Sequence, residues 1–230
     1  APDSFFRLMD DLKPTWYPAV PPIQQSILET AADHRDVVAR SRLRFIRSAA
    51  SRLPPKTMLG LEALFNAPVV EAYGMTEAAH GITSNLLPPR VCKEGSVGVP
   101  LGGLELKVVG SSGKNLAEGE VGEILIRGKN VITGYEDNPE ANANSFAEGW
   151  LRTGDLGYLD TDGYLFIRGR VKEMINRGGE KISPREVEEA LMENDSVSEA
   201  IAFPIPHPTL GEDVAAAVVL KEGRSLSENI

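Results

Sequence analysis

Short apolar runs alternate with helix-like segments along the first part of the chain. Residues 15–20, 43–48 and 68–73 are β-prone or apolar runs of strand length. Prolines stand where the intervening helices would begin, at Pro22 and Pro54, and apolar positions recur behind them with helical spacing. Because strands alternate with helices, this pattern predicts a parallel, layered α/β region.

The pattern changes at Gly95, where glycines and turn pairs become dense. Short β-prone runs lie between them at residues 104–109 and 121–127, and residues 160–163 carry a strong hairpin signal. We therefore expect a small antiparallel sheet or a distorted barrel here, with a short helix inserted at residues 139–146.

The pattern of apolar and polar residues changes again beyond Arg170. Residues 184–192 have the apolar spacing of an amphipathic helix, with Ser183 as N-cap and Glu186 at the capping-box position. Two further strands are expected behind this helix, which predicts a small α+β domain. The expected division is an α/β part, a β-barrel subdomain and an incomplete α+β C-terminal domain (residues 1–92, 93–171 and 172–230).

Composition narrows the classes of function. The 230 residues carry a net charge of −9 and are 42% hydrophobic, which is enough apolar material for a core. The acidic balance argues against nucleic-acid binding, which needs clustered Lys and Arg. The single cysteine, Cys92, has no partner for an internal disulfide and is expected to be a bystander thiol in a reducing compartment.

The sequence also bears on location. No apolar run approaches the roughly 20 residues of a membrane span, so none is expected. Residue 1 is Ala rather than an initiator Met, which suggests that targeting segments at the termini are missing. We expect a cytoplasmic location, with the peroxisome as the alternative.

The first candidate site follows the third predicted strand and reads Glu71-Ala72-Tyr73-Gly74-Met75-Thr76-Glu77. Ligands of open α/β sheets bind beyond the carboxyl ends of strands, where Gly74 would give a tight turn. Thr76 could hydrogen-bond a phosphate, and Glu77 could hold Mg²⁺, a hard cation that prefers oxygen ligands. The alternative is a helix start, with Thr76 as N-cap and Glu77 in the first turn.

The second candidate site is centred on Asp155, within Gly149-Trp150-Leu151-Arg152-Thr153-Gly154-Asp155-Leu156-Gly157. Glycines on both sides would let the backbone pass close to a ligand. A single carboxylate can accept hydrogen bonds from both hydroxyls of a ribose. The alternative is an ordinary turn aspartate.

The third candidate site is a basic, glycine-containing segment at residues 168–184, where the texture changes. Its basic residues could bind ribose or phosphate, and its paired glycines suit a hinge or a narrow ligand channel. The alternative to a functional segment is a charged surface exposed to solvent.

Together and in this order, the three segments resemble the signature segments of the adenylate-forming superfamily, which comprises acyl-CoA synthetases, aryl-CoA ligases, luciferases and adenylation domains. The resemblance extends over nearly the whole chain and includes residues 95–100 and 119–124. It implies a partial acyl-CoA synthetase-like fold with domain alternation. It also implies a ligase that joins a small carboxylic acid to CoA through an acyl-adenylate, using ATP and Mg²⁺.

The resemblance assigns roles around the nucleotide. Ala49, within residues 48–51, would flank the adenine together with Glu71, Ala72 and Tyr73, ahead of Gly74. Thr76 would contact the α-phosphate, and Glu77 would bind Mg²⁺.

The resemblance also assigns roles in the second and third segments. Asp155 would take the ribose hydroxyls, with Arg170 beside it. Lys172 would be the hinge on which the small domain turns between the two half-reactions. Gly178 and Gly179 would line the path of the pantetheine arm.

Within the superfamily, the segments around Glu71–His80 and Arg177–Pro184 most resemble the oxalyl-CoA synthetase-like acid–CoA ligases. His80, one turn beyond Thr76, could reach the acyl pocket and pair with a second carboxylate; the alternative is a polar side chain on the face of a helix. Ala49 and Ala50 stand where an oxalate-specific site would be expected to carry a further hydroxyl, which argues against oxalate. A small acid such as oxalate is the favoured substrate.

The sequence lacks two segments of the family's pattern. The phosphate loop and the C-terminal lysine of the family would lie before residue 1 and beyond Ile230, so we expect this chain alone not to form acyl-adenylate. An adenylation domain that loads a carrier-protein thiol is one alternative, against which the Gly178-Gly179 pair favours CoA. A non-catalytic nucleotide-binding module is the other, against which the intact candidate residues argue.

Overall fold

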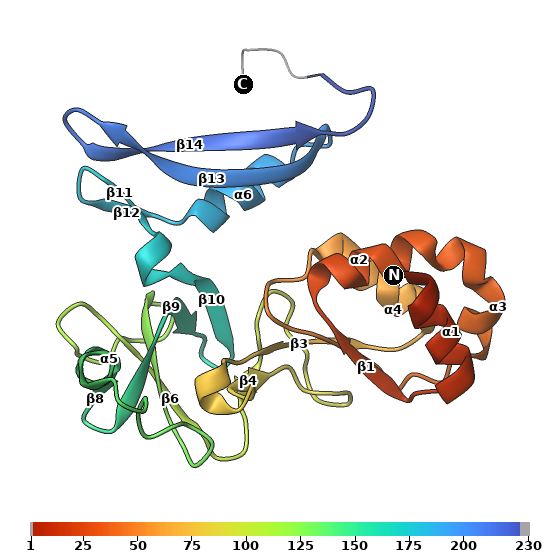
Figure 1. Cartoon of the computed structure of the whole chain (residues 1–230), viewed down its shortest axis with the longest axis horizontal. Helices are drawn as coiled ribbons and strands as arrows, with labels where there is room; N and C mark the ends of the chain where they lie inside the picture. The colour runs from red at the N-terminus through yellow and green to blue at the C-terminus, as the bar shows by residue number, and fades with distance from the viewer. Residues whose placement is uncertain (1, 226–230) are drawn as a thin grey trace. The chain divides into compact units, whose positions relative to one another are not determined.

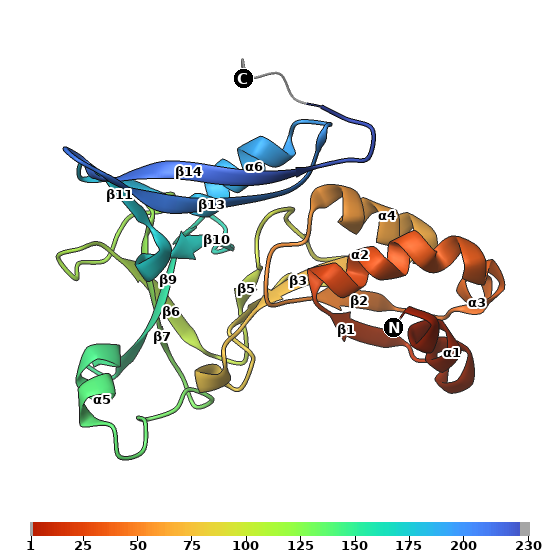
Figure 2. The same cartoon turned by 45° about the horizontal axis from the view of Figure 1, so that its top comes forward.

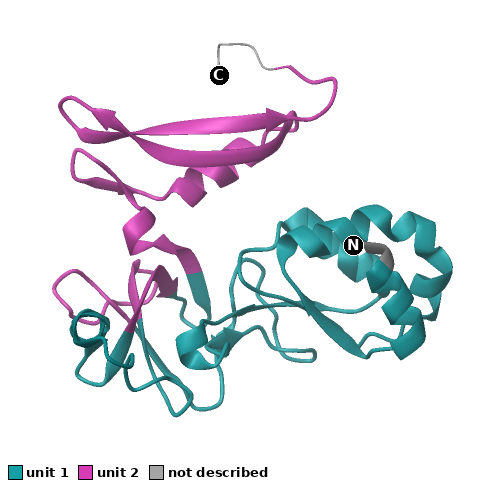
Figure 3. Ribbon diagram, viewed as in Figure 1, with its two compact units in different colours: residues 1–107, 125–151, 159–166 teal, residues 108–124, 152–158, 167–230 magenta. Residues whose placement is uncertain are grey.

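The computed structural model of the chain describes residues 2–225 and divides the chain into two compact units. The first unit comprises residues 1–107, 125–151 and 159–166, and the second comprises residues 108–124, 152–158 and 167–230 (Figure 3). Among the described residues, no helix is both long enough and apolar enough to cross a bilayer.

The first unit contains a sheet with the strand order β1-β2-β3-β4-β5. Its strands are β1 (Trp16–Ala19), β2 (Phe45–Ser48), β3 (Val69–Tyr73), β4 (Thr83–Ser84) and β5 (Val99–Pro100). The first three run parallel, β4 pairs antiparallel with β3, and β5 pairs antiparallel with β4. The predicted parallel α/β region is confirmed, and the carboxyl ends of β1, β2 and β3 lie at one edge of the sheet.

Helices connect these strands. They are α1 (Pro2–Leu12), α2 (Pro21–Thr30), α3 (Arg35–Arg40) and α4 (Pro55–Phe65), with a 3₁₀ turn η1 (Ala31–His34) between α2 and α3. Prolines occupy the first turns of α2 and α4, where a missing N–H costs nothing. Asn66 ends α4 in the left-handed conformation. α2 and α4 lie side by side on one face of the sheet (Figure 2).

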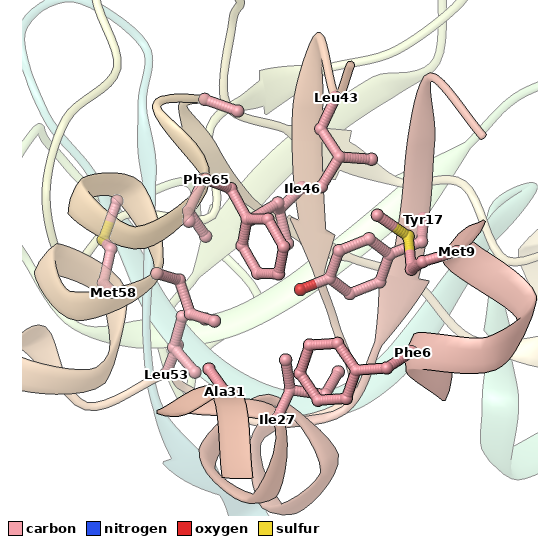
Figure 4. Packing of buried hydrophobic residues seen from close by; sticks show 13 residues of the cluster. Phe6, Met9, Tyr17, Ile27, Ala31, Leu43, Ile46, Leu53, Met58 and Phe65 are labelled. Carbon is pink, nitrogen blue, oxygen red and sulfur yellow. The ribbon is translucent and has the colours of Figure 1, made fainter. Parts of the chain in front are cut away.

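The hydrophobic core of this unit lies between the helices and the sheet (Figure 4). Phe6, Ile27 and Ile46 are at most 1% exposed. Tyr17 points into the same cluster, and burial raises the pKa of its hydroxyl. That hydroxyl donates to Gln24 Oε1 at 3.0 Å, so the buried oxygen is satisfied.

The second sheet has the order β10-β9-β7-β6, with β8 paired to β9. Its strands are β6 (Glu105–Val109), β7 (Gly122–Arg127), β8 (Phe146–Ala147), β9 (Trp150–Leu159) and β10 (Leu165–Arg170). The predicted barrel is wrong, because the sheet is open, with β6 and β10 at its edges. No strand pairing among the described residues joins β6 to β10, so the sheet does not close.

Two other predictions in this region concern turns and helices. The hairpin signal at residues 160–163 is confirmed: Asp160 Oδ1 accepts from the backbone N–H groups of Asp162 at 3.0 Å and Tyr164 at 2.9 Å. The inserted helix is α5 (Pro139–Ser145), where Asn138 caps the N-terminus by accepting from Ala141 N at 3.1 Å.

The third sheet has the order β12-β11-β14-β13. After the 3₁₀ turn η3 (Val171–Glu173) come the elements β11 (Ile175–Arg177), β12 (Glu180–Ile182), α6 (Pro184–Met192), β13 (Val197–His207) and β14 (Gly211–Leu220). α6 packs against β13 (Figure 1). The predicted helix and strands are confirmed, but the predicted cap is not: the Ser183 hydroxyl donates to Arg168 O at 2.8 Å instead of capping α6.

Candidate functional site

The residues that follow β3 form a compact, non-helical turn. Thr76–Ala78 is a single 3₁₀ turn (η2), and Ala79 and His80 both have left-handed backbone conformations. Backbone N–H groups close the turn, with Ala78 N and His80 N donating to Met75 O at 3.1 and 3.0 Å. The alternative of a continuing helix is therefore wrong, and His80 is an exposed residue of the turn rather than of a helix face.

Gly74 is required by the close approach of this turn to itself. A Cβ atom at position 74 would lie 2.1 Å from the carbonyl oxygen of His80. Only a residue without a side chain fits there. Gly74 therefore sets the path of the backbone that carries Thr76 and Glu77.

Replacing Gly74 with Ala is expected to lower the midpoint of thermal unfolding, because the turn backbone must move to admit the methyl group. Overpacking of this kind costs about 1–3 kcal/mol. The matched control is Gly81→Ala, where the nearest atom to an added Cβ is 4.0 Å away. Circular dichroism on heating measures both, and equal midpoints for the two variants would contradict the close-approach argument.

Glu77 is half-buried, and its carboxylate has a defined partner. Tyr135 Oη donates to Glu77 Oε1 at 2.9 Å. Burial, and then the carboxylate of Glu77, raise the pKa of the Tyr135 hydroxyl, while Ser145 acts in the opposite direction. The tyrosine thus stays protonated at neutral pH and acts as the hydrogen-bond donor.

Glu77 offers one carboxylate, the kind of oxygen ligand that Mg²⁺ prefers. No cluster of three or more His, Cys, Asp or Glu side chains occurs within residues 2–225. A cation at Glu77 would have one carboxylate from the protein and its other ligands from water and phosphate. That is how Mg²⁺ usually binds in nucleotide sites.

The segments expected to flank an adenine lie on adjacent strands of the first unit. Ser48, at the end of β2, is in register with Glu71 on β3. Glu71 is buried, and its Oε1 accepts from Leu53 N at 2.9 Å, which fixes the loop that carries Ala49 and Ala50. Ala72 is buried and Tyr73 is half-buried on the same strand.

Two features of that loop stand out. The Ser48 hydroxyl is buried and has no hydrogen-bond partner among the described residues. An unpaired buried hydroxyl is costly, so a ligand or water is its natural partner. Ala50 is exposed and has a φ of 81°, a conformation that side-chain-bearing residues rarely adopt.

Cys92 is half-buried, close to the carbonyl of Val69 at 3.9 Å. Burial raises the pKa of its thiol, and Glu62 and Glu71 raise it further. A raised pKa leaves little thiolate at neutral pH.

The predicted ribose ligand lies on the second unit, within strand β9 rather than in a turn. Only 11% of the Asp155 side chain is exposed, and its Oδ1 accepts from Arg170 Nε at 3.2 Å. The Asp155 backbone is held by Thr153, whose hydroxyl accepts from Asp155 N at 3.1 Å and donates to Ile124 O at 2.9 Å. Asp155 and Arg170, which the resemblance placed beside each other, are thus in contact.

Lys172 lies in η3 and is exposed. The chain on its N-terminal side is tied down, because the Ser183 hydroxyl donates to Arg168 O. Gly169 passes so close to this hydroxyl that an added Cβ would lie 3.3 Å from it.

Gly178 and Gly179 form the two-residue turn between β11 and β12. Both have positive φ, 61° and 99°, as this kind of hairpin turn requires. Gly178 N donates to Leu210 O at 2.9 Å, and Gly179 N donates to Asn176 Oδ1 at 3.1 Å. The turn geometry alone accounts for paired glycines here.

Comparison with known proteins adds to this geometry. A sequence profile described as AMP-binding enzyme matches residues 1–136, more than half of the chain. The chain belongs to the AMP-binding enzyme family. A second profile, described as AMP-binding enzyme C-terminal domain, matches residues 186–230. The predicted superfamily is confirmed.

Named relatives are similar over almost the whole chain. An oxalate–CoA ligase of Arabidopsis thaliana is 47% identical over 226 residues, which are 98% of this chain and 44% of the relative. A sulfoacetate–CoA ligase of Cupriavidus necator is 43% identical over 209 residues, 90% of this chain and 40% of the relative. The crystal structure of ATP-bound MatB from Rhodopseudomonas palustris aligns with a TM-score of 0.88 at 31% identity, over 99% of this chain and 44% of that protein. The chain thus spans less than half the length of these relatives.

The predicted site residues of this chain fall on both units. Ala49, Ala50, Glu71–Gly74, Thr76, Glu77 and His80 lie on the first, and Asp155, Arg170, Lys172, Gly178 and Gly179 lie on the second. Sequence reasoning missed Tyr135 at Glu77 and the contact between Glu71 and Leu53. Neither has a local signal, since each partner is distant along the chain.

Proposed function

We propose that this chain is part of an AMP-forming acid–CoA ligase. In the first half-reaction, an oxygen of the acid attacks the α-phosphorus of ATP, the bond to pyrophosphate breaks, and an acyl-adenylate forms. In the second, the sulfur of CoA attacks the acyl carbon, AMP leaves, and the thiol loses its proton. The observation that carries the proposal is the turn at residues 74–80, which places Thr76 and an oriented carboxylate of Glu77 just beyond the carboxyl end of β3.

This chemistry needs no protein nucleophile. It needs the acid and the α-phosphate to be held in line, and it needs the charge on the phosphates to be neutralised. In this proposal Thr76 donates to the α-phosphate and Glu77 holds Mg²⁺. The metal, when bound, neutralises charge on the phosphate oxygens.

The remainder of the nucleotide would be bound by the other candidate residues. Ala49 and strand β3 would border the adenine, and the orphaned Ser48 hydroxyl lies in the same segment. Asp155 would accept hydrogen bonds from the ribose hydroxyls, with Arg170 orienting its carboxylate through the bond from Nε. Lys172 would serve as the hinge of the small domain, whose boundary we place there.

CoA is proposed as the acceptor instead of a carrier-protein thiol. The support is that relatives 47% and 43% identical to this chain are named CoA ligases. Gly178 and Gly179 would line the pantetheine path, because a turn without side chains leaves room for a narrow, flexible arm.

The favoured substrate is a small acid with a second negatively charged group, oxalate first. The two relatives are named for oxalate and for sulfoacetate, and both acids are of this kind. His80 is exposed on the turn that carries Thr76 and could pair with the second charge. A cytoplasmic or peroxisomal location is part of the same proposal.

The test is formation of AMP that requires ATP, an acid and CoA together, in a protein of the relatives' length that carries this chain. We expect AMP only when all three are present. AMP that forms equally well with a carrier protein and without CoA would favour the carrier-loading alternative.

A further inference from the structure

The loop between β7 and α5 wraps the turn that carries Thr76 and Glu77. Asn130 Nδ2 donates to Ala78 O at 2.9 Å and to Gly81 O at 2.8 Å. Ile132 N donates to Glu77 O at 2.8 Å. The same loop then brings Tyr135 to the carboxylate of Glu77. The backbone and the side chain of Glu77 are therefore held by one segment far away in sequence.

Resting on the proposed function, we propose that Tyr135 is a positioning residue that orients the carboxylate of Glu77 for Mg²⁺. A glutamate side chain has three rotatable bonds, and its freedom must be lost when it binds a cation. The hydrogen bond from Tyr135 to Oε1 selects one orientation before the metal arrives. Hydrogen-bonded partners of metal ligands act in this way in other metal sites.

Tyr135 is itself anchored. Its backbone N donates to Asn142 Oδ1 at 2.7 Å, and its backbone O accepts from Asn142 Nδ2 at 2.9 Å. Its ring meets Phe146 edge-on, with 6.2 Å between centroids. A side chain fixed at both its backbone and its ring loses little further entropy in holding Glu77, which suits a positioning role.

The alternative is that Tyr135 only stabilises the loop. A positioning role affects nucleotide binding only when Mg²⁺ is present, whereas a structural role affects it with and without Mg²⁺. The experiment measures binding of α,β-methylene-ATP, which cannot release pyrophosphate, to the proposed full-length enzyme by calorimetry, with Mg²⁺ and with EDTA. Mg²⁺ should raise the affinity of wild type for the analogue, and we call the ratio of the affinities with Mg²⁺ and with EDTA the Mg²⁺-dependent gain. In the Tyr135→Phe variant this gain should be about tenfold smaller, the low end of the range of about 10- to 100-fold for partners of metal ligands. The variant's affinity in EDTA should stay within about twofold of wild type.

Two further variants sharpen the result. Asn142→Ala keeps the side chains of Tyr135 and Glu77 but removes the two hydrogen bonds that hold the Tyr135 backbone. It should therefore also reduce the Mg²⁺-dependent gain. Tyr164→Phe is the matched control, because it too removes one hydroxyl, which donates to Val91 O at 2.6 Å away from this turn. It should leave the gain unchanged. Thermal unfolding of each variant establishes that it is folded.

The outcomes distinguish this inference from the proposal beneath it. A Tyr135→Phe variant that keeps the full Mg²⁺-dependent gain, or that weakens binding equally in Mg²⁺ and EDTA, would overturn the positioning role. If wild-type protein binds the analogue equally well with and without Mg²⁺, the proposed Mg²⁺-binding role of Glu77 is refuted, and with it that part of the proposed function.

Discussion

In a protein of the relatives' length that carries this chain, replacing Glu77 with Gln is expected to lower the rate of acyl-adenylate formation by about 10²- to 10³-fold, the size of effect seen when one preorganised electrostatic group is removed. Gln keeps the shape of the side chain and an oxygen that can accept from Tyr135. It loses the negative charge that a hard cation requires. Acid-dependent release of pyrophosphate is the measurement, because it reports the first half-reaction alone.

The matched control for that variant is Glu62→Gln. Glu62 is also a half-buried glutamate of the first unit that accepts one hydrogen bond, from Val69 N at 2.9 Å. Its amide form can still accept, so pyrophosphate release should stay within about twofold of wild type. If Glu77→Gln and Glu62→Gln behave alike, Glu77 has no special part in adenylation.

The second large effect is expected at Asp155. Asp155→Ala should weaken binding of ATP about 10- to 100-fold, because hydrogen bonds to a charged group are worth about 1.5–3 kcal/mol. The fold should tolerate the change. Its partner Arg170 has 66% of its side chain exposed and can be solvated when the carboxylate is gone. Calorimetric titration with ATP measures the effect.

Asp162→Ala is the control for that experiment. Asp162 lies in the turn between β9 and β10, and 67% of its side chain is exposed. Its carboxylate pairs with Lys93 Nζ at 2.6 Å. We expect unchanged nucleotide affinity there. An Asp155→Ala variant that binds ATP as tightly as Asp162→Ala would show that the ribose is held elsewhere.

The elements of this chain that were predicted well from the sequence are those with local signals. The runs at residues 15–20, 43–48 and 68–73 became parallel strands because their apolar residues and the intervening proline-led helices specify a layered α/β arrangement. The paired Asp155 and Arg170 were placed together from the resemblance, and adjacent strands hold them.

The predictions that failed depended on distant partners or on backbone conformations that composition does not specify. Ser183 has the spacing of a capping box, but Arg168 O, 15 residues earlier, takes its hydroxyl. The alternative placed His80 on the face of a helix, but Ala79 and His80 adopt left-handed conformations that end the 3₁₀ turn after Ala78. Tyr135 is 58 residues from Glu77 in sequence, so no local pattern could join them.

The most direct test of the account is AMP formation with ATP and Mg²⁺ by a protein of the relatives' length that carries this chain, with and without CoA. The acids to compare are oxalate, malonate, short and medium fatty acids and benzoates. The account predicts AMP formation that needs both acid and CoA and is fastest with oxalate. Faster turnover of a monocarboxylate would leave the ligase in place and remove the proposed role of His80. Nucleotide binding without acid- and CoA-dependent AMP formation from any of these acids would contradict the account.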